Sequence, residues 1–171
     1  IGTPGGPLSW AVVLGGGIVI SQQGTAEAEQ ITEGNQRYGG RDTTAGGTVT
    51  SASASAIDDD SLDNIYGGWV AGGTNTSGTT AASNSVTVSG GTIGGAVYGG
   101  YVSGNGSATG NSVTVSGGTI RSNAYGAYIG SGTATGNSVI LSGGTIGSNA
   151  YGGFVAGSGS ATGNSVTVSG G

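Results

Sequence analysis

Apolar and polar residues alternate with a period of two through most of the second half of the chain. In the stretch SVTVS (85–89), Val86 and Val88 point to one side of a strand, and Thr87 and Ser89 point to the other. This alternation is typical of a half-buried β-strand. Glycine pairs separate the short alternating runs, and none of the runs has the 3.6-residue period of a helix. The pattern therefore predicts an all-β fold of short strands joined by glycine turns.

The strand pattern recurs in tandem copies that each begin at an asparagine. The copies start at Asn84, Asn111, Asn137 and Asn164, with separations of 27, 26 and 27 positions (111−84, 137−111, 164−137). A fixed period of this length is typical of a solenoid, in which each residue stacks on its counterpart one coil away. We therefore expect a parallel β-solenoid with about one coil per 26–27-residue repeat. Each coil would contain strands equivalent to 85–89, 92–93 and 97–102, followed by a surface loop.

Equivalent positions in the copies predict ladders of like residues along the solenoid. The predicted core ladders consist of Val86, Val88, Val113, Val115, Val139, Leu141, Val166, Val168, Ile93, Ile120 and Ile146. A carboxamide both donates and accepts hydrogen bonds, so Asn84, Asn111, Asn137 and Asn164 are expected to form an amide ladder at a turn.

Aromatic residues form two further columns. The first consists of Tyr66, Tyr98, Tyr125 and Tyr151, and the second, three residues later, of Trp69, Tyr101, Tyr128 and Phe154. Strand positions an odd number apart face opposite sides, which would place one column inside and the other outside. Alternatively, the intervening glycines form a bulge that lets both columns pack within the solenoid. An exposed column would suit sugar binding or self-association, so the second column is the candidate interaction face.

The pattern divides the chain into three regions. Residues 1–30 include an uncharged apolar run, LSWAVVLGGGIVI (8–20), which fits a truncated export signal or a capping or docking strand. Residues 31–63 hold most of the acidic residues and two of the three arginines, and we interpret them as an atypical capping region. Residues 64–171 form the repeat array, which stops within a copy. We expect a fragment of a longer chain or a subunit of a homopolymer.

Composition narrows the function. Charged residues make up 6% of the chain, against about 25% in typical globular domains. The only cations are Arg37, Arg41 and Arg121, too few for a nucleic-acid surface, and the apolar run is too short to span a membrane. Without Cys, His or Lys, a hydroxyl nucleophile has no base, and the repeats lack the paired carboxylates of a glycosidase. We therefore expect neither an enzyme nor a cofactor.

Two weaker signals remain. Asp58, Asp59, Asp60 and Asp63 offer hard oxygen ligands for a metal such as calcium, although a solvated acidic turn explains them better. Columns of threonine favour an ice-binding face only weakly, because threonine is also common in strands for its β-propensity. Ice binding and action on polysaccharide are therefore remote alternatives.

The tandem NSVTVSGGTI segments, each followed by YGG or YGA and a loop rich in Gly, Ser, Asn, Ala and Thr, resemble the repeats of bacterial autotransporter passenger regions and related surface adhesins. The resemblance covers residues 64–171. It implies a right-handed β-helix exported to the bacterial cell surface, where it would act in adhesion or matrix formation on a host or matrix protein or glycan. We accordingly expect a non-enzymatic extracellular rod, or alternatively a subunit of a self-assembling extracellular filament.

Overall fold

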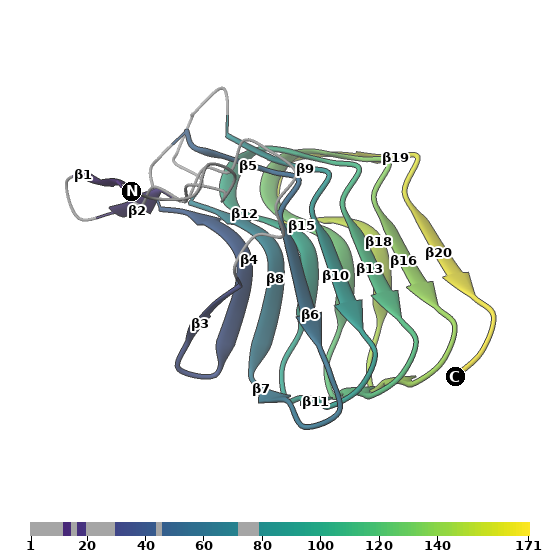
Figure 1. The fold of residues 1–171 in the computed structure, drawn as a ribbon. Helices are drawn as coiled ribbons and strands as arrows, with labels where there is room; N and C mark the ends of the chain where they lie inside the picture. The colour runs from purple at the N-terminus through teal and green to yellow at the C-terminus, as the bar shows by residue number, and fades with distance from the viewer. Residues whose placement is uncertain (1–11, 15–16, 20–29, 44–45, 72–78) are drawn as a thin grey trace, which may run out of the picture.

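The computed structural model describes residues 12–14, 17–19, 30–43, 46–71 and 79–171, and all regular elements in these ranges are β-strands. The strands wind into coils that stack along one axis, as Figure 1 shows. The strands are β1 (Val12–Leu14), β2 (Gly17–Val19), β3 (Ile31–Glu33), β4 (Gln36–Asp42), β5 (Thr48–Thr50), β6 (Ser53–Ala56), β7 (Ser61–Leu62), β8 (Asn64–Val70), β9 (Thr80–Ala82), β10 (Ser85–Val88), β11 (Thr92–Ile93), β12 (Val97–Thr109), β13 (Ser112–Val115), β14 (Thr119–Ile120), β15 (Ala124–Thr135), β16 (Ser138–Leu141), β17 (Thr145–Ile146), β18 (Ala150–Val155), β19 (Gly159–Thr162) and β20 (Ser165–Val168).

Each side of the solenoid is a parallel sheet. One side has the strand order β20-β16-β13-β10-β6, the next has β17-β14-β11-β7, and a third contains β18-β15-β12-β8-β4. Equivalent residues of successive copies pair directly, as in Val86 with Val113 and Val113 with Val139. The prediction of a parallel β-solenoid with one coil per repeat is therefore confirmed. Antiparallel pairing occurs at the N-terminal side, between β1 and β2 and between β3 and β4.

The expected surface loop after Val102 is instead a fourth side of the coil. Strand β12 continues to Thr109 and pairs with β15 on one side and β9 on the other. The register between β12 and β15 shifts after Val102, and this irregularity absorbs the one-residue difference between the two copies. The loop prediction was wrong because small side chains of this segment, such as Ala108 and Ala134, are fully buried.

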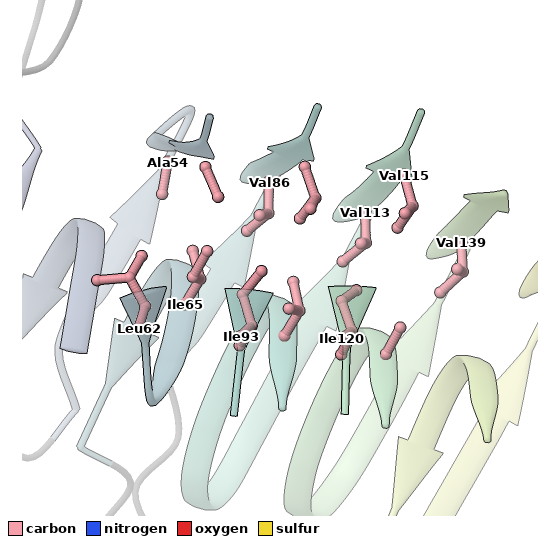
Figure 2. Packing of buried hydrophobic residues seen from close by; sticks show 13 residues of the cluster. Ala54, Leu62, Ile65, Val86, Ile93, Val113, Val115, Ile120 and Val139 are labelled. Atoms are coloured by element: carbon pink, nitrogen blue, oxygen red, sulfur yellow. The ribbon is translucent and has the colours of Figure 1, made fainter. Parts of the chain in front are cut away.

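Two apolar clusters fill the coils. The larger one lies between the sheet that contains β10 and the sheet that contains β11, where Val86, Val113 and Val139 face Ile93 and Ile120 (Figure 2). The smaller one lies behind the fourth side and includes Val102, Ala108 and Ile129. Isoleucine and valine side chains in the middle coils are fully buried, which is the main source of stabilisation in such a fold.

Glycines close two of the corners in each coil. The second glycine of each SGG segment has a positive φ, 76° at Gly91 and 74° at Gly118. Residues immediately before the repeat asparagines also have positive φ, 63° at Gly110 and 54° at Ser83. Side chains are disfavoured in this conformation, so the glycine-rich composition follows from the coil geometry.

Candidate functional site

A bulge at the paired glycines places both aromatic columns on the same outer face of the solenoid. In β12, Val97 and Val102 are fully buried, while Tyr98 and Tyr101 between them are half-buried. A Cβ on Gly99 would lie 2.7 Å from the carbonyl oxygen of Ser112, on the opposite side of the coil interior. A Cβ on Gly100 would meet the interior Asn111 side chain at 2.5 Å. Because both glycines face inward, both aromatic residues face outward.

This arrangement differs from both sequence-based alternatives. Alternation alone predicted that one column would be inside, and the bulge was expected to bring both columns into the solenoid. The glycine pair does form the irregularity, since pairing between β12 and β8 omits Gly99 and Gly67. The bulge was expected to turn the second aromatic residue inward. It turns that residue outward instead, because it adds one inward-facing residue between the two aromatic residues.

The two columns form an outer aromatic ladder of stacked rings. The first column gains Tyr38 at its N-terminal end, and its neighbouring rings lie 4.9–5.1 Å apart between centroids with interplanar angles of 2–9°. In the second column, the centroid distances are 6.2 Å for Trp69–Tyr101, 5.1 Å for Tyr101–Tyr128 and 5.4 Å for Tyr128–Phe154. Rings of different columns meet edge to face, as in Tyr98 and Tyr101 at 5.1 Å. Both stacked and edge-to-face pairs are favourable aromatic geometries.

Mutual packing leaves mainly ring edges and hydroxyl groups at the surface. Tyr125 is only 9% exposed, and Tyr98, Tyr101 and Tyr128 are also partly covered. Burial is the largest cause that raises the pKa of Tyr98 to about 12, and repulsion from the neighbouring tyrosines adds to it. The same two causes raise the pKa of Tyr66 further. These hydroxyl groups are therefore neutral near pH 7, so the face offers uncharged hydrogen-bonding groups on an apolar layer.

Among the described residues, Arg41 is the one cation that contacts the ladder, and it lies at the N-terminal end. Arg41 pairs with Trp69 in the strand register and takes the place of an aromatic residue in the second column. Its guanidinium carbon lies 5.0 Å from the Tyr38 ring centroid and 5.2 Å from that of Trp69, and it forms an ion pair with Glu33. Cation–π contacts of this kind stabilise an exposed aromatic edge by about 0.5–1 kcal/mol.

The repeat asparagines form a continuous buried amide ladder. Asn111 Nδ2 donates to Asn137 Oδ1 at 2.9 Å and to the Ala81 carbonyl at 2.8 Å. Asn111 Oδ1 accepts from the backbone N–H and the Nδ2 of Asn84, at 3.0 and 2.9 Å. Both hydrogens and the oxygen of this carboxamide are thus used, which is what burial of an amide requires. Asn137 repeats the pattern, and Asn164 accepts from Asn137 at the C-terminal end.

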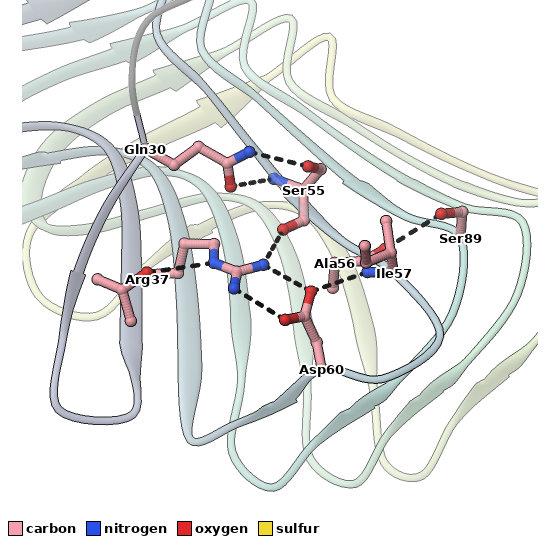
Figure 3. A network of polar contacts seen from close by, with 8 residues as sticks. Gln30, Arg37, Ser55, Ala56, Ile57, Asp60 and Ser89 are labelled. Atoms are coloured by element: carbon pink, nitrogen blue, oxygen red, sulfur yellow. Dashed lines mark hydrogen bonds and ion pairs between the residues drawn. The ribbon is translucent and has the colours of Figure 1, made fainter.

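Polar side chains close the N-terminal end of the apolar core. Arg37 pairs with Ile65 in the strand register, so it stands where the next coils have aliphatic residues. Its guanidinium binds both carboxylate oxygens of Asp60, at 2.6 and 2.8 Å, and donates to the Ser55 carbonyl at 2.6 Å (Figure 3). The hydrogen bond from Arg37 lowers the pKa of Asp60. Asp42 likewise takes the register position of Val70, is buried, and accepts a hydrogen bond from the Thr48 N–H.

The acidic residues proposed as metal ligands do not gather into a site. Asp60 is engaged by Arg37, whereas Asp58, Asp59 and Asp63 are exposed around the turn. Across the described ranges, no group of three or more potential ligands is placed to hold a metal ion. This turn acts instead as part of the N-terminal cap.

The C-terminal end has apolar residues where the N-terminal end has charges. Val166 and Val168 in β20 are 43% and 66% exposed, although their counterparts Val86 and Val88 are buried. Leu141 and Ile146 in the preceding coil are only partly buried. Within residues 1–171, the core ladders therefore begin at polar side chains and continue unchanged into the last coil.

Sequence reasoning missed Arg37 and Asp42 as capping residues. A usable signal was present, because aligning Tyr38-Gly39-Gly40 with the later YGG segments places Arg37 in the core position of Ile65.

Comparison of the chain with protein-family models, curated proteins and solved structures gave no match. In the part of the chain that the structure describes, no helix has the length and hydrophobicity needed to cross a membrane.

Proposed function

We propose that this chain is a non-enzymatic segment of an extracellular rod on a bacterial surface, where it serves structural and adhesive roles. The observation that carries the proposal is the in-register stacking of like residues from one coil to the next. Valine, isoleucine, asparagine and tyrosine ladders all follow the same axis and reinforce the parallel sheets. A scaffold of this kind resists bending, because every coil is hydrogen-bonded along its length to its neighbours.

The surface chemistry supports a binding role over catalysis. Arg121 is the single charged residue between positions 79 and 171, so this part of the array has no acid and base pair to activate a hydroxyl group. Beyond Arg41 at its N-terminal end, the outer aromatic ladder is instead a long, uncharged face of partly exposed rings. Such a face suits contact with a glycan or protein surface, or with another rod, through apolar contacts and hydrogen bonds.

Surface display tests the adhesive role directly. A non-adherent bacterium displaying this chain should attach to glycan-coated or protein-coated surfaces, or to other displaying cells, more strongly than cells without it. Replacing Tyr101 and Tyr128 with Ser should weaken attachment, whereas the control Thr87→Ser with Thr114→Ser alters another face and should not. Attachment at background level on every surface would refute the adhesive role, and equal loss in both variants would refute the assignment of the face.

A second candidate is a self-assembling filament subunit, in which β20, paired on one side only within residues 1–171, would pair with another copy of the chain. Unpaired strand edges and uncovered apolar residues are prone to pair with another chain. The alternative docking segment, residues 8–20, lies largely outside the described residues, of which β1 and β2 form an antiparallel pair.

Electron microscopy of the purified chain distinguishes the two candidates. Filaments or end-to-end pairs that disappear with Val168→Asp but persist with the neighbouring Thr167→Asp would support self-assembly through β20. Single short rods at all concentrations would refute self-assembly and leave the rod proposal in place.

A further inference from the structure

All seven tyrosines of the chain lie in the outer aromatic ladder. Five of them, Tyr38, Tyr66, Tyr98, Tyr125 and Tyr151, form one continuous stack, hereafter the tyrosine stack. We propose that the tyrosine stack is an oxidative cross-linking site, in which neighbouring coils are joined through dityrosine by a peroxide-dependent one-electron oxidant. This site is independent of adhesion and would covalently fasten one coil to the next.

The geometry of the tyrosine stack favours coupling between neighbours. The Tyr98 and Tyr125 rings are parallel within 2°, and their centroids lie 5.0 Å apart. Main-chain pairing of the same two residues holds the rings in register. The fold therefore holds the phenol rings of adjacent rungs as direct neighbours. Fixing two reactants in this way raises their effective concentration by orders of magnitude over a bimolecular encounter.

The second column provides an entry route for the oxidant. Tyr101 and Tyr128 are partly exposed, and their rings contact that of Tyr98 at centroid distances of 5.1 and 6.0 Å. Trp69 stacks on Tyr101 in the same column. An electron removed from an exposed ring can thus be replaced from a ring in contact with it, so oxidation at the surface reaches the more buried Tyr125.

Composition removes the usual competitors for oxidation. The chain contains no cysteine, methionine or histidine, the first two of which are commonly oxidised side chains. Tyrosine and tryptophan remain as the oxidisable groups, and Trp69 as well as every tyrosine belongs to the ladder, whereas Trp10 lies outside the described residues. Among the described residues, oxidation is therefore directed to the ladder.

The reaction balances with peroxide as the electron acceptor. Each of two tyrosines loses one electron and its phenolic proton to give a phenoxyl radical. The radicals join at their ortho carbons, and the hydrogens on those carbons move to the oxygens to restore two phenols. The two electrons and two protons released reduce one hydrogen peroxide to two water molecules, in a step catalysed by a haem peroxidase.

The test treats the full chain, at a dilution that disfavours contact between molecules, with hydrogen peroxide and a haem peroxidase. We expect dityrosine fluorescence, a mass decrease of two hydrogens per link in monomeric protein, and linked peptides that join neighbouring rungs such as Tyr98 and Tyr125. Links mapped mainly between distant rungs or between separate molecules would overturn the proposal, as would absence of dityrosine.

Matched variants isolate the effect of neighbouring rungs. In a background with Tyr101→Phe and Tyr128→Phe, the pair Tyr66→Phe with Tyr125→Phe leaves three tyrosines on alternate rungs. The control pair Tyr38→Phe with Tyr151→Phe also leaves three tyrosines, but on adjacent rungs. Phenylalanine already occupies the ladder at Phe154, so the stacking should persist. We expect at least ten-fold less intramolecular dityrosine in the alternate-rung variant. Equal yields would refute the proposal.

A readout on the unmodified sequence covers the case in which a variant does not fold. Oxidation of the wild-type chain in denaturant should spread the mapped links over many tyrosine pairs, whereas the folded chain should give neighbouring-rung links. The same distribution of links in both states would show that the fold does not direct the coupling.

Discussion

At the N-terminal end of the solenoid, Arg37 and Asp42 take the register positions that Ile65 and Val70 occupy one coil later. At the C-terminal end, Val166 and Val168 remain the same residues as in the buried coils and are 43% and 66% exposed. The first coil thus replaces core residues with polar groups, whereas the last coil within residues 1–171 keeps the core residues of the interior coils.

The difference shows what a coil needs at each boundary. An interior coil has another coil on each side, so aliphatic and amide ladders are enough to bury its apolar groups and satisfy its polar groups. At the N-terminal end, β3 pairs with the edge of β4, and the side chains of Arg37 and Gln30 bind the carbonyl and the N–H of Ser55 on the edge strand β6. In the last coil, β20 pairs with β16 on one side only within residues 1–171, and Val166 and Val168 keep their aliphatic side chains. Substitutions in an interior coil, in the capped first coil and in the last coil should therefore lower the free energy of unfolding by different amounts.

Interrupting the asparagine ladder should give the largest effect. Asn111→Ala removes the acceptor for two buried donors of Asn84, and an orphaned buried donor costs about 1–3 kcal/mol. We expect a loss of about 3 kcal/mol in the free energy of unfolding, measured with denaturant. Asn164→Ala, in the partly exposed last coil of this chain where water can replace the lost groups, should cost about 1 kcal/mol. Equal costs would contradict the distinction between buried interior coils and the partly exposed last coil.

Adding a methyl group at the inward glycines should come next. A Cβ on Gly99 would lie 2.5 Å from the Gly126 carbonyl oxygen, inside a coil held on both sides, so Gly99→Ala should cost about 2–3 kcal/mol. Gly152→Ala meets Ser165 in the last strand, which can move outward, and should cost about half as much. Gly100→Ala should cost least, because its Cβ would meet the Asn111 side chain rather than the backbone and the next coil already has Ala127 at this position. Thermal unfolding of the three variants checks this order.

Removing the cap should have a moderate effect on stability and a clear effect on association. Arg37→Leu leaves Asp60 without its ion-pair partner, and because both side chains are 18% exposed, we expect a loss of about 2 kcal/mol. The double variant Arg37→Leu with Asp60→Leu should recover most of this stability. It should also make the N-terminal end apolar like the C-terminal end, so sedimentation should reveal stronger self-association. A double variant that stays monomeric whenever the wild type does would argue against the capping role.

Acid should loosen the capped end, with the smallest effect of the four. The folded-state pKa of Asp60 is lowered, so its ion pair contributes stability above the unfolded-state pKa of about 3.9 and loses it as the pH falls through the folded-state value. We expect the free energy of unfolding to decline as the pH falls below about 4. Asp60→Asn should remove that part of the pH dependence, and an unchanged profile in this variant would show that other carboxylates cause the decline.

The repeat sequence predicted the architecture well because identical residues recur at identical offsets. Stacked coils are the arrangement in which such residues lie directly on one another. Val86 and its counterparts reveal both the strand and its inward side from alternation alone. The fourth side was missed because Gly, Ser, Ala and Asn have low β-propensity, and the pairing of residues 103–109 with adjacent coils overrides that preference.

The outward position of the second aromatic column could not be deduced from alternation. Alternation assumes an unbroken strand, whereas Gly99 and Gly100 both face inward, a conformation that requires the absence of a side chain at Gly99. The capping role of Arg37 depends on its distant partner Asp60, 23 residues further along the chain, and short-range patterns contain no information on that pairing.

Amide hydrogen exchange resolved by peptide tests the central claim most directly, namely a solenoid of stacked coils whose strands are protected by neighbouring coils and, in the first coil, by polar side chains. We predict the slowest exchange in β12, β13 and β15, nearly as slow exchange in the capped strands β4 and β6, and the fastest strand exchange in β20. Exchange in β20 as slow as in β13, or in β4 and β6 as fast as in β20, would contradict the account.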